Sequence, residues 1–126
     1  MSRPFKFLLP LLFLLPVISA SAGEVARAQF TTDVIDREPV DNVEQLDSSA
    51  NRVVFFTELR DFEGQTVTHQ WVYNDSVMFE KSFSPRGPRW RVWSSKTLQP
   101  GWDGIWYVHT LGEDGTRLAT SNFTYR

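Results

Sequence analysis

Seven segments rich in β-branched and aromatic residues constrain the fold of this chain more than any other feature. These segments are residues 25–34, 51–60, 66–74, 77–83, 89–95, 104–112 and 116–126. Between them lie short stretches such as DFEGQ, SPRGP and GEDGT, whose glycine, proline and aspartate residues favour turns. Short strands at this spacing predict an all-β protein, a single immunoglobulin- or fibronectin-III-like antiparallel β-sandwich of about seven strands.

Alternation along the segments predicts which side chains point into the sandwich. In residues 66–74 the set Val67, His69, Trp71 and Tyr73 shares one face, so we expect this face to be the core face, with Trp71 at its centre. The same reasoning places Trp106 inward on segment 104–112, which is apolar on both faces and is expected in mid-sheet. Asp114-Gly115, between two apolar alternations, predicts a hairpin.

Segment 89–95 separates an apolar face from a face that carries arginines. Trp90 and Val92 fall on one face and are expected inward, whereas Arg89, Arg91 and Trp93 fall on the other.

Residues 36–51, DREPVDNVEQLDSSAN, form an acidic connection between the first two predicted strands. Pro39 suits the first position of a helix, and Val40, Val43 and Leu46 recur at a spacing of three. We therefore expect one or two helical turns on the edge of the sandwich.

The first 22 residues are typical of a secretory signal peptide. Arg3 and Lys6 form a basic start, an apolar run follows, and Ala20-Ser21-Ala22 ends it. An uncleaved membrane anchor is the alternative, but the run is shorter than the roughly 20 residues that cross a bilayer, and two prolines interrupt it. We expect a β-sandwich domain at residues 23–126 that is periplasmic or secreted and does not span a membrane after cleavage. The chain has no cysteine and hence no disulfide, so a bacterial periplasm is favoured.

Charge and aromatic residues suggest where a partner would bind. The chain has a formal net charge of −2, yet residues 86–96 contain only basic charges. The net negative charge argues against nucleic acid as a binding partner. We expect a binding or assembly module that recognises an envelope protein or a glycan, because tryptophan and arginine serve as stacking surfaces and anchors. The candidate partner-binding residues are Arg86, Arg89, Arg91, Trp93 and Trp102.

Two alternatives need no ligand at these residues. The arginines can stack on neighbouring aromatic rings as a structural ladder, and Trp102 can fold back over the end of the sandwich. A structural accessory protein that pairs with a partner through an exposed sheet edge is the alternative function.

A hydrolase ranks third, because no nucleophile elbow, Gly-rich phosphate loop or S-x-x-K motif is present. Ser94 and Ser95 beside Lys96 are expected to bond to local backbone, and His69 to lie at the rim of the core. His69 and His109 lack nearby partners for zinc, and residues 33–47 lack the glycine and ligand spacing of a calcium loop. We therefore expect no catalytic residue, no cofactor and no metal.

Several motifs resemble a bacterial family described as domain of unknown function 2914. They include VARAQFTT, REPV, FFTEL, GQTVTHQW, RWRVWSSK, LQPGWDGIW and DGTRLATSNFTY. The combination of His69 with Trp71, Arg89 to Lys96, and Gly104 with Trp106 carries the resemblance. It implies an exported or membrane-tethered bacterial protein and brings no activity, ligand or cofactor with it.

We predict cleavage between Ala22 and Gly23, because the small residues of the Ala-Ser-Ala end fit signal peptidase. Intact-mass measurement of the protein recovered from the periplasm checks this. Recovery of the full-length chain in the membrane fraction would instead support the anchor.

Overall fold

Residues 23–126 are the part of the chain that the computed structural model describes, and their regular elements are all strands. The expected signal peptide, residues 1–22, lies outside the described residues. The strands are β1 Glu24–Thr31, β2 Val34–Ile35, β3 Glu38–Pro39, β4 Gln45–Leu46, β5 Arg52–Arg60, β6 Val67–Tyr73, β7 Ser76–Phe83, β8 Arg89–Thr97, β9 Gly104–Leu111 and β10 Arg117–Tyr125. Among these described residues there is no helix long and apolar enough to cross a membrane.

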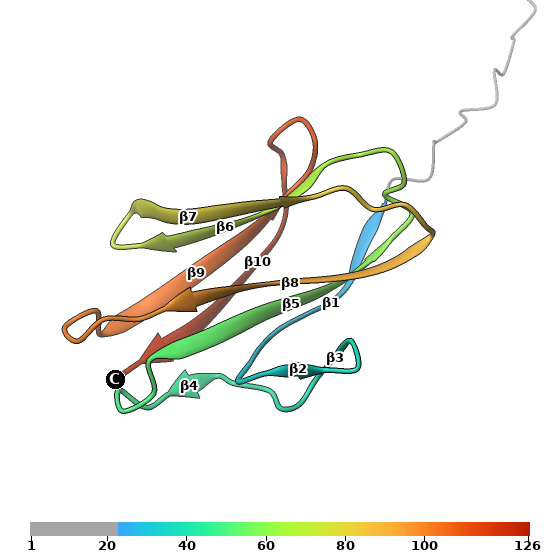
Figure 1. The fold of residues 1–126 in the computed structure, drawn as a ribbon. Helices are drawn as coiled ribbons and strands as arrows, with labels where there is room; N and C mark the ends of the chain where they lie inside the picture. Colours follow the sequence, from blue (N-terminus) through green and yellow to red (C-terminus); the bar gives the residue numbers. More distant parts are fainter. Residues whose placement is uncertain (1–22) are drawn as a thin grey trace, which may run out of the picture.

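Two sheets face each other (Figure 1). One has three strands in the order β1-β5-β8, and the other has five in the order β4-β10-β9-β6-β7. All pairings are antiparallel except that of β4, which runs parallel to β10. This arrangement confirms the predicted antiparallel sandwich, and β9 lies in the middle of its sheet as expected.

The β9–β10 hairpin forms where Asp114-Gly115 predicts it. Gly115 has φ +84°, a left-handed conformation that glycine adopts without steric cost. The Gly115 amide donates to the carbonyl of Gly112 at 3.0 Å, and the Gly112 amide donates to the carbonyl of Thr116 at 2.8 Å.

The core lies between the sheets, and Trp71 and Trp106 are its largest fully buried side chains. Phe30, Phe55 and Phe123 pack around them. Inward positions for Trp71 and Trp106 are therefore confirmed. Trp90 is only half-buried, because it lies at the start of β8 and packs against a smaller cluster at that end. The buried members of this second cluster are Leu59, Phe62, Val67 and Val92.

The predicted helical turns in residues 36–51 are wrong. β2 and β3 form a short hairpin there, and β4 adds to the edge of the larger sheet. Asp36 and Arg37 both have positive φ, 53° and 62°, which is the backbone that a two-residue hairpin turn requires. Leu46 is buried but Val40 is 48% exposed, so the spacing of three does not mark one apolar helical face.

We predict that Trp71→Ala and Trp106→Ala each lower the free energy of unfolding by about 3–5 kcal/mol, because each leaves a large cavity in the core. Trp90→Ala should cost less, since its ring is only half-buried. Urea denaturation measures these differences. Leu118→Ala, at an exposed position, serves as the control and should stay within about 0.5 kcal/mol of wild type. Midpoints near wild type for Trp71→Ala and Trp106→Ala would contradict the packing.

Candidate functional site

Strand β8 carries the candidate site, and its pairing fixes which side chains face outward. It pairs with β5 without a register shift, from Arg89 opposite Arg60 to Thr97 opposite Arg52. Val92 and Ser94 are buried. The alternation of a strand therefore brings Arg89, Arg91 and Trp93 to the outer face, as the sequence predicts.

A buried polar cluster holds β8 against the opposite sheet. His69 on β6 contacts Ser94 Oγ through Nδ1 at 2.8 Å and Thr57 Oγ1 through Nε2 at 2.9 Å. The indole Nε1 of Trp71 donates to Ser94 Oγ at 3.0 Å. Burial, and secondly the positive charge of Lys81, lowers the pKa of His69 to about 3, so the imidazole is neutral near pH 7.

Two expectations about this cluster are corrected. His69 is fully enclosed rather than at the rim of the core, and Ser94 bonds to side chains rather than to local backbone. The Ser94–His69 contact has the distance that a nucleophile and its base need. However, the exposed fractions of 2% and 0% leave no access for a substrate, so the pair serves packing between the sheets.

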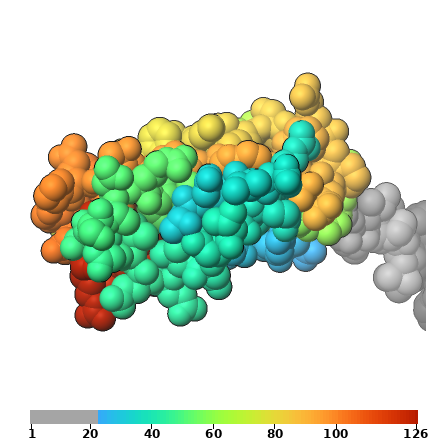
Figure 2. Space-filling model, turned by 60° about the horizontal axis from the view of Figure 1, so that its bottom comes forward, coloured from blue at the N-terminus to red at the C-terminus, as the bar shows by residue number. Residues whose placement is uncertain are grey.

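On the outer face, four arginines and two glutamates form a connected set of ion pairs, which we call the arginine network. It consists of Arg27, Glu38, Glu58, Arg60, Arg89 and Arg91, and its net charge is +2. The β2–β3 hairpin, cyan in Figure 2, lies on this face. Its Glu38 forms an ion pair with Arg91.

Glu58 is the centre of the network. Its side chain is only 5% exposed, and its oxygens accept from Arg27 at 3.2 Å, Arg89 at 3.0 Å and Arg60 Nε at 2.9 Å. Desolvation opposes ionisation, but the hydrogen bonds from Arg89 and Arg60 outweigh it and lower the pKa of Glu58 to about 2. The carboxylate is therefore ionised throughout the neutral range.

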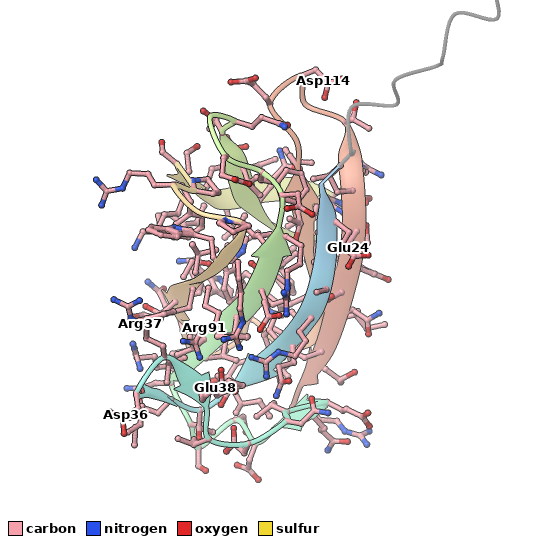
Figure 3. All side chains as sticks on the ribbon, turned by 90° about the vertical axis from the view of Figure 1, so that its right-hand side faces the viewer. Glu24, Asp36, Arg37, Glu38, Arg91 and Asp114 are labelled. Atoms are coloured by element: carbon pink, nitrogen blue, oxygen red, sulfur yellow. The ribbon has the colours of Figure 1, made fainter. Side chains whose placement is uncertain are left out.

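Glu38 links the hairpin to β1 and β8. Both of its oxygens accept from Arg27, at 3.0 and 2.8 Å, and Oε2 also accepts from Arg91 Nη1 at 2.6 Å. The Arg27 and then the Arg91 hydrogen bonds lower the pKa of Glu38 to about 2. Figure 3 shows Arg37, Glu38 and Arg91 at the same end of the molecule.

A hollow of about 250 Å³ lies beside the network, and we call it the arginine hollow. Arg37, Arg89, Trp90, Arg91 and Trp93 line it, without a carboxylate-bearing residue. Arg37, in the turn of the β2–β3 hairpin, forms no ion pair within residues 23–126. Three arginines thus lie around a concave surface, which suits an anionic group.

The structure brings three of the five predicted binding residues together, namely Arg89, Arg91 and Trp93. Arg86 is not among the residues that line the hollow, although its guanidinium lies 5.8 Å from the centre of the Trp90 ring. Trp102 packs on Trp106, with ring centres 5.7 Å apart, and the Lys96 ammonium lies over it at 5.2 Å. The alternative in which Trp102 folds back over the end of the core is therefore the observed one.

The predicted ladder of stacked arginines is replaced at Arg89 and Arg91 by ion pairs with glutamates. On this face the cation–ring contact comes from Arg27, which lies 4.9 Å from the centre of the Phe56 ring. Sequence reasoning missed Arg27, Arg37, Glu38 and Glu58. The one signal for Glu58 was a charge next to Leu59 at the end of a largely apolar run, since buried charges need partners.

No group of three or more histidine and acidic side chains within residues 23–126 is placed to hold a metal ion.

The family described as "Protein of unknown function (DUF2914)" matches residues 64–125. Over these residues the chain belongs to the DUF2914 family. The matched part runs from the turn before β6 to the end of β10 and includes the whole of β8. The motifs VARAQFTT, REPV and FFTEL lie before it. No curated protein matches the chain.

We predict that Glu58→Gln lowers the free energy of unfolding at neutral pH by about 1–3 kcal/mol, because it removes charge-assisted hydrogen bonds to three half-exposed arginines. The pKa of Glu58 falls from 4.5 to about 2 on folding. Its ionised form therefore stabilises the fold above about pH 4.5, and this contribution disappears as the pH falls toward 2.

Urea denaturation between pH 2 and 7 measures both effects. As the pH falls from 4.5 to about 2, the unfolded and folded pKa values of Glu58, the variant should lose less stability than wild type. Part of the pH dependence of stability should remain, because the pKa of Glu38 is lowered in the same way. Glu63→Gln, at an exposed residue without an ion pair in the described part of the chain, is the matched control. Parallel pH curves for wild type and Glu58→Gln would contradict a stabilising role for this carboxylate.

Proposed function

We propose that this protein is a non-catalytic binding module of the bacterial cell envelope, which recognises an anionic group of a protein or glycan component. The observation that carries the proposal is the arginine hollow, because three arginines and two tryptophans line it and no carboxylate does. Planar guanidinium groups match carboxylate and phosphate oxygens in two-point hydrogen bonds, and an indole supplies a flat apolar surface beside them.

The network supports this proposal by ordering the arginines before a ligand arrives. Arg89 is held by Glu58 and Arg91 by Glu38, so less side-chain freedom remains to be lost on binding. Arg91 donates to Glu38 through one terminal nitrogen, which leaves further N–H groups of its guanidinium for a ligand. The ion pairs thus act as a support for the binding surface as well as for the fold.

The signal-peptide pattern of residues 1–22 and the absence of cysteine support a periplasmic or secreted location. The enclosed Ser94–His69 pair gives no support to a hydrolase. A structural accessory role remains the second candidate function, and the unpaired outer edge of β8 favours it.

We predict that Arg37→Gln weakens capture of an envelope component several-fold, since it removes one of three positive charges of the hollow. Arg37 lies outside the arginine network, so stability should not change. Affinity capture from envelope extract, at low and at raised salt, compares this variant with wild type. Arg117→Gln, which removes a charge from β10 on the other sheet, is the matched control. Capture that is equal for wild type and both variants would exclude the hollow as the binding site.

A further inference from the structure

The outer edge of β8 differs from the other sheet edges in the described part of the chain. β1 and β7 are also edge strands, but each has a register irregularity, between Val25 and Arg27 and opposite Trp71 and Val72. β4 has two residues. β8 has nine, in unbroken register and without proline. Bulges, prolines and short length are the usual ways to protect an edge from pairing, and β8 has none of them.

The backbone of β8 is available on this edge. Its ladder runs to β5 alone, and within residues 23–126 the other bond to its backbone is a long one of 3.5 Å, from Lys96 Nζ to the carbonyl of Thr97. A row of amides and carbonyls without protein partners can accept a further strand.

A groove of about 300 Å³ runs beside the edge. Its lining is Lys81, Phe83, Arg91, Val92 and Trp93, so β7 of the opposite sheet supplies one wall and β8 the other. In Figure 1 β7 and β8 follow the same side of the sandwich, one in each sheet. Side chains of an added strand would alternate between this groove and the outer face that carries Arg89 and Arg91.

Charge decides which strand fits. β8 carries Arg89, Arg91 and Lys96 and no acidic residue, and Lys81 lies across the groove. A second copy of β8 would bring three more cations beside these ones, and like charges on adjacent edges repel. An extended segment with acidic side chains is the complementary partner.

We infer that the outer edge of β8 binds an extended acidic segment of a partner protein as an additional strand of the three-stranded sheet. The inference rests on the proposed binding function, and within it selects a protein rather than a glycan. Backbone hydrogen bonds to β8 supply affinity, and the basic side chains on either side of the edge select for acidic residues.

Nine-residue acetylated and amidated peptides that alternate glutamate with valine test the inference. Two further versions carry N-methyl groups on every second residue, in the two possible phases. Because alternate amides of a strand point to the same edge, one phase should weaken binding by about tenfold or more, and the other should not. Equal binding of both versions would overturn strand pairing, and so would no binding of the unmethylated peptide. A lysine-for-glutamate peptide should not bind.

Variants of the protein separate this inference from the proposed function. Lys96→Glu reverses a charge on β8, and Lys96 lies outside both the network and the hollow. This variant should bind the acidic peptide about tenfold more weakly than wild type. Arg117→Glu, the same change on β10, should leave binding unchanged. Hydrogen exchange should show new protection of β8 amides in the complex, and its absence would contradict pairing. If pairing fails while capture still depends on Arg37, the binding function stands and only the strand-pairing inference is lost.

Discussion

Burial of Trp71 between the two sheets is the constraint on which the rest of the structure depends. An indole N–H inside a core is costly without an acceptor, and Ser94 Oγ accepts it at 3.0 Å. Ser94 must therefore point inward, and because side chains of a strand alternate, Trp93 must point outward. The same alternation carries Arg89 and Arg91 to the outer face, so a contact in the core decides which face of the molecule is cationic.

Two carboxylates pair with the arginines of this outer face, and they come from different elements. Glu58 lies directly opposite Arg91 on β5 and is almost enclosed by three guanidinium groups. Glu38 arrives from the β2–β3 hairpin, whose turn depends on positive φ at Asp36 and Arg37. The same turn brings Arg37 to the hollow. A structural role in ion pairs and a role in binding are thus compatible explanations of RWRVWSSK, because the glutamates orient the arginines and leave a net positive charge.

Local patterns in the sequence were sufficient to predict the seven long strands, because alternation and turn residues depend on near neighbours. They placed Trp71 and Trp106 in the core and the hairpin at Asp114-Gly115. They failed where the deciding contact is distant in sequence. Glu38 and Arg91 are separated by 53 positions, and His69 and Ser94 by 25, so no local pattern marks either pair. The helix prediction for residues 36–51 failed because a spacing of three also occurs in a segment that folds as part of a hairpin and a short edge strand, with Leu46 buried and Val40 exposed.

Segregation of charge explains how β8 can have a regular, exposed edge that does not pair with the same edge of another copy. The chain as a whole has a formal net charge of −2, yet β8 is purely basic, so positive potential is concentrated along one side of the sandwich. Repulsion between like charges keeps two β8 edges apart. On β1 and β7 the register irregularities have the same effect, because they also prevent pairing between edges. Unlike a bulge, this protection is selective. It repels another cationic edge, but it attracts an acidic strand, and the backbone beneath remains regular enough to pair with it.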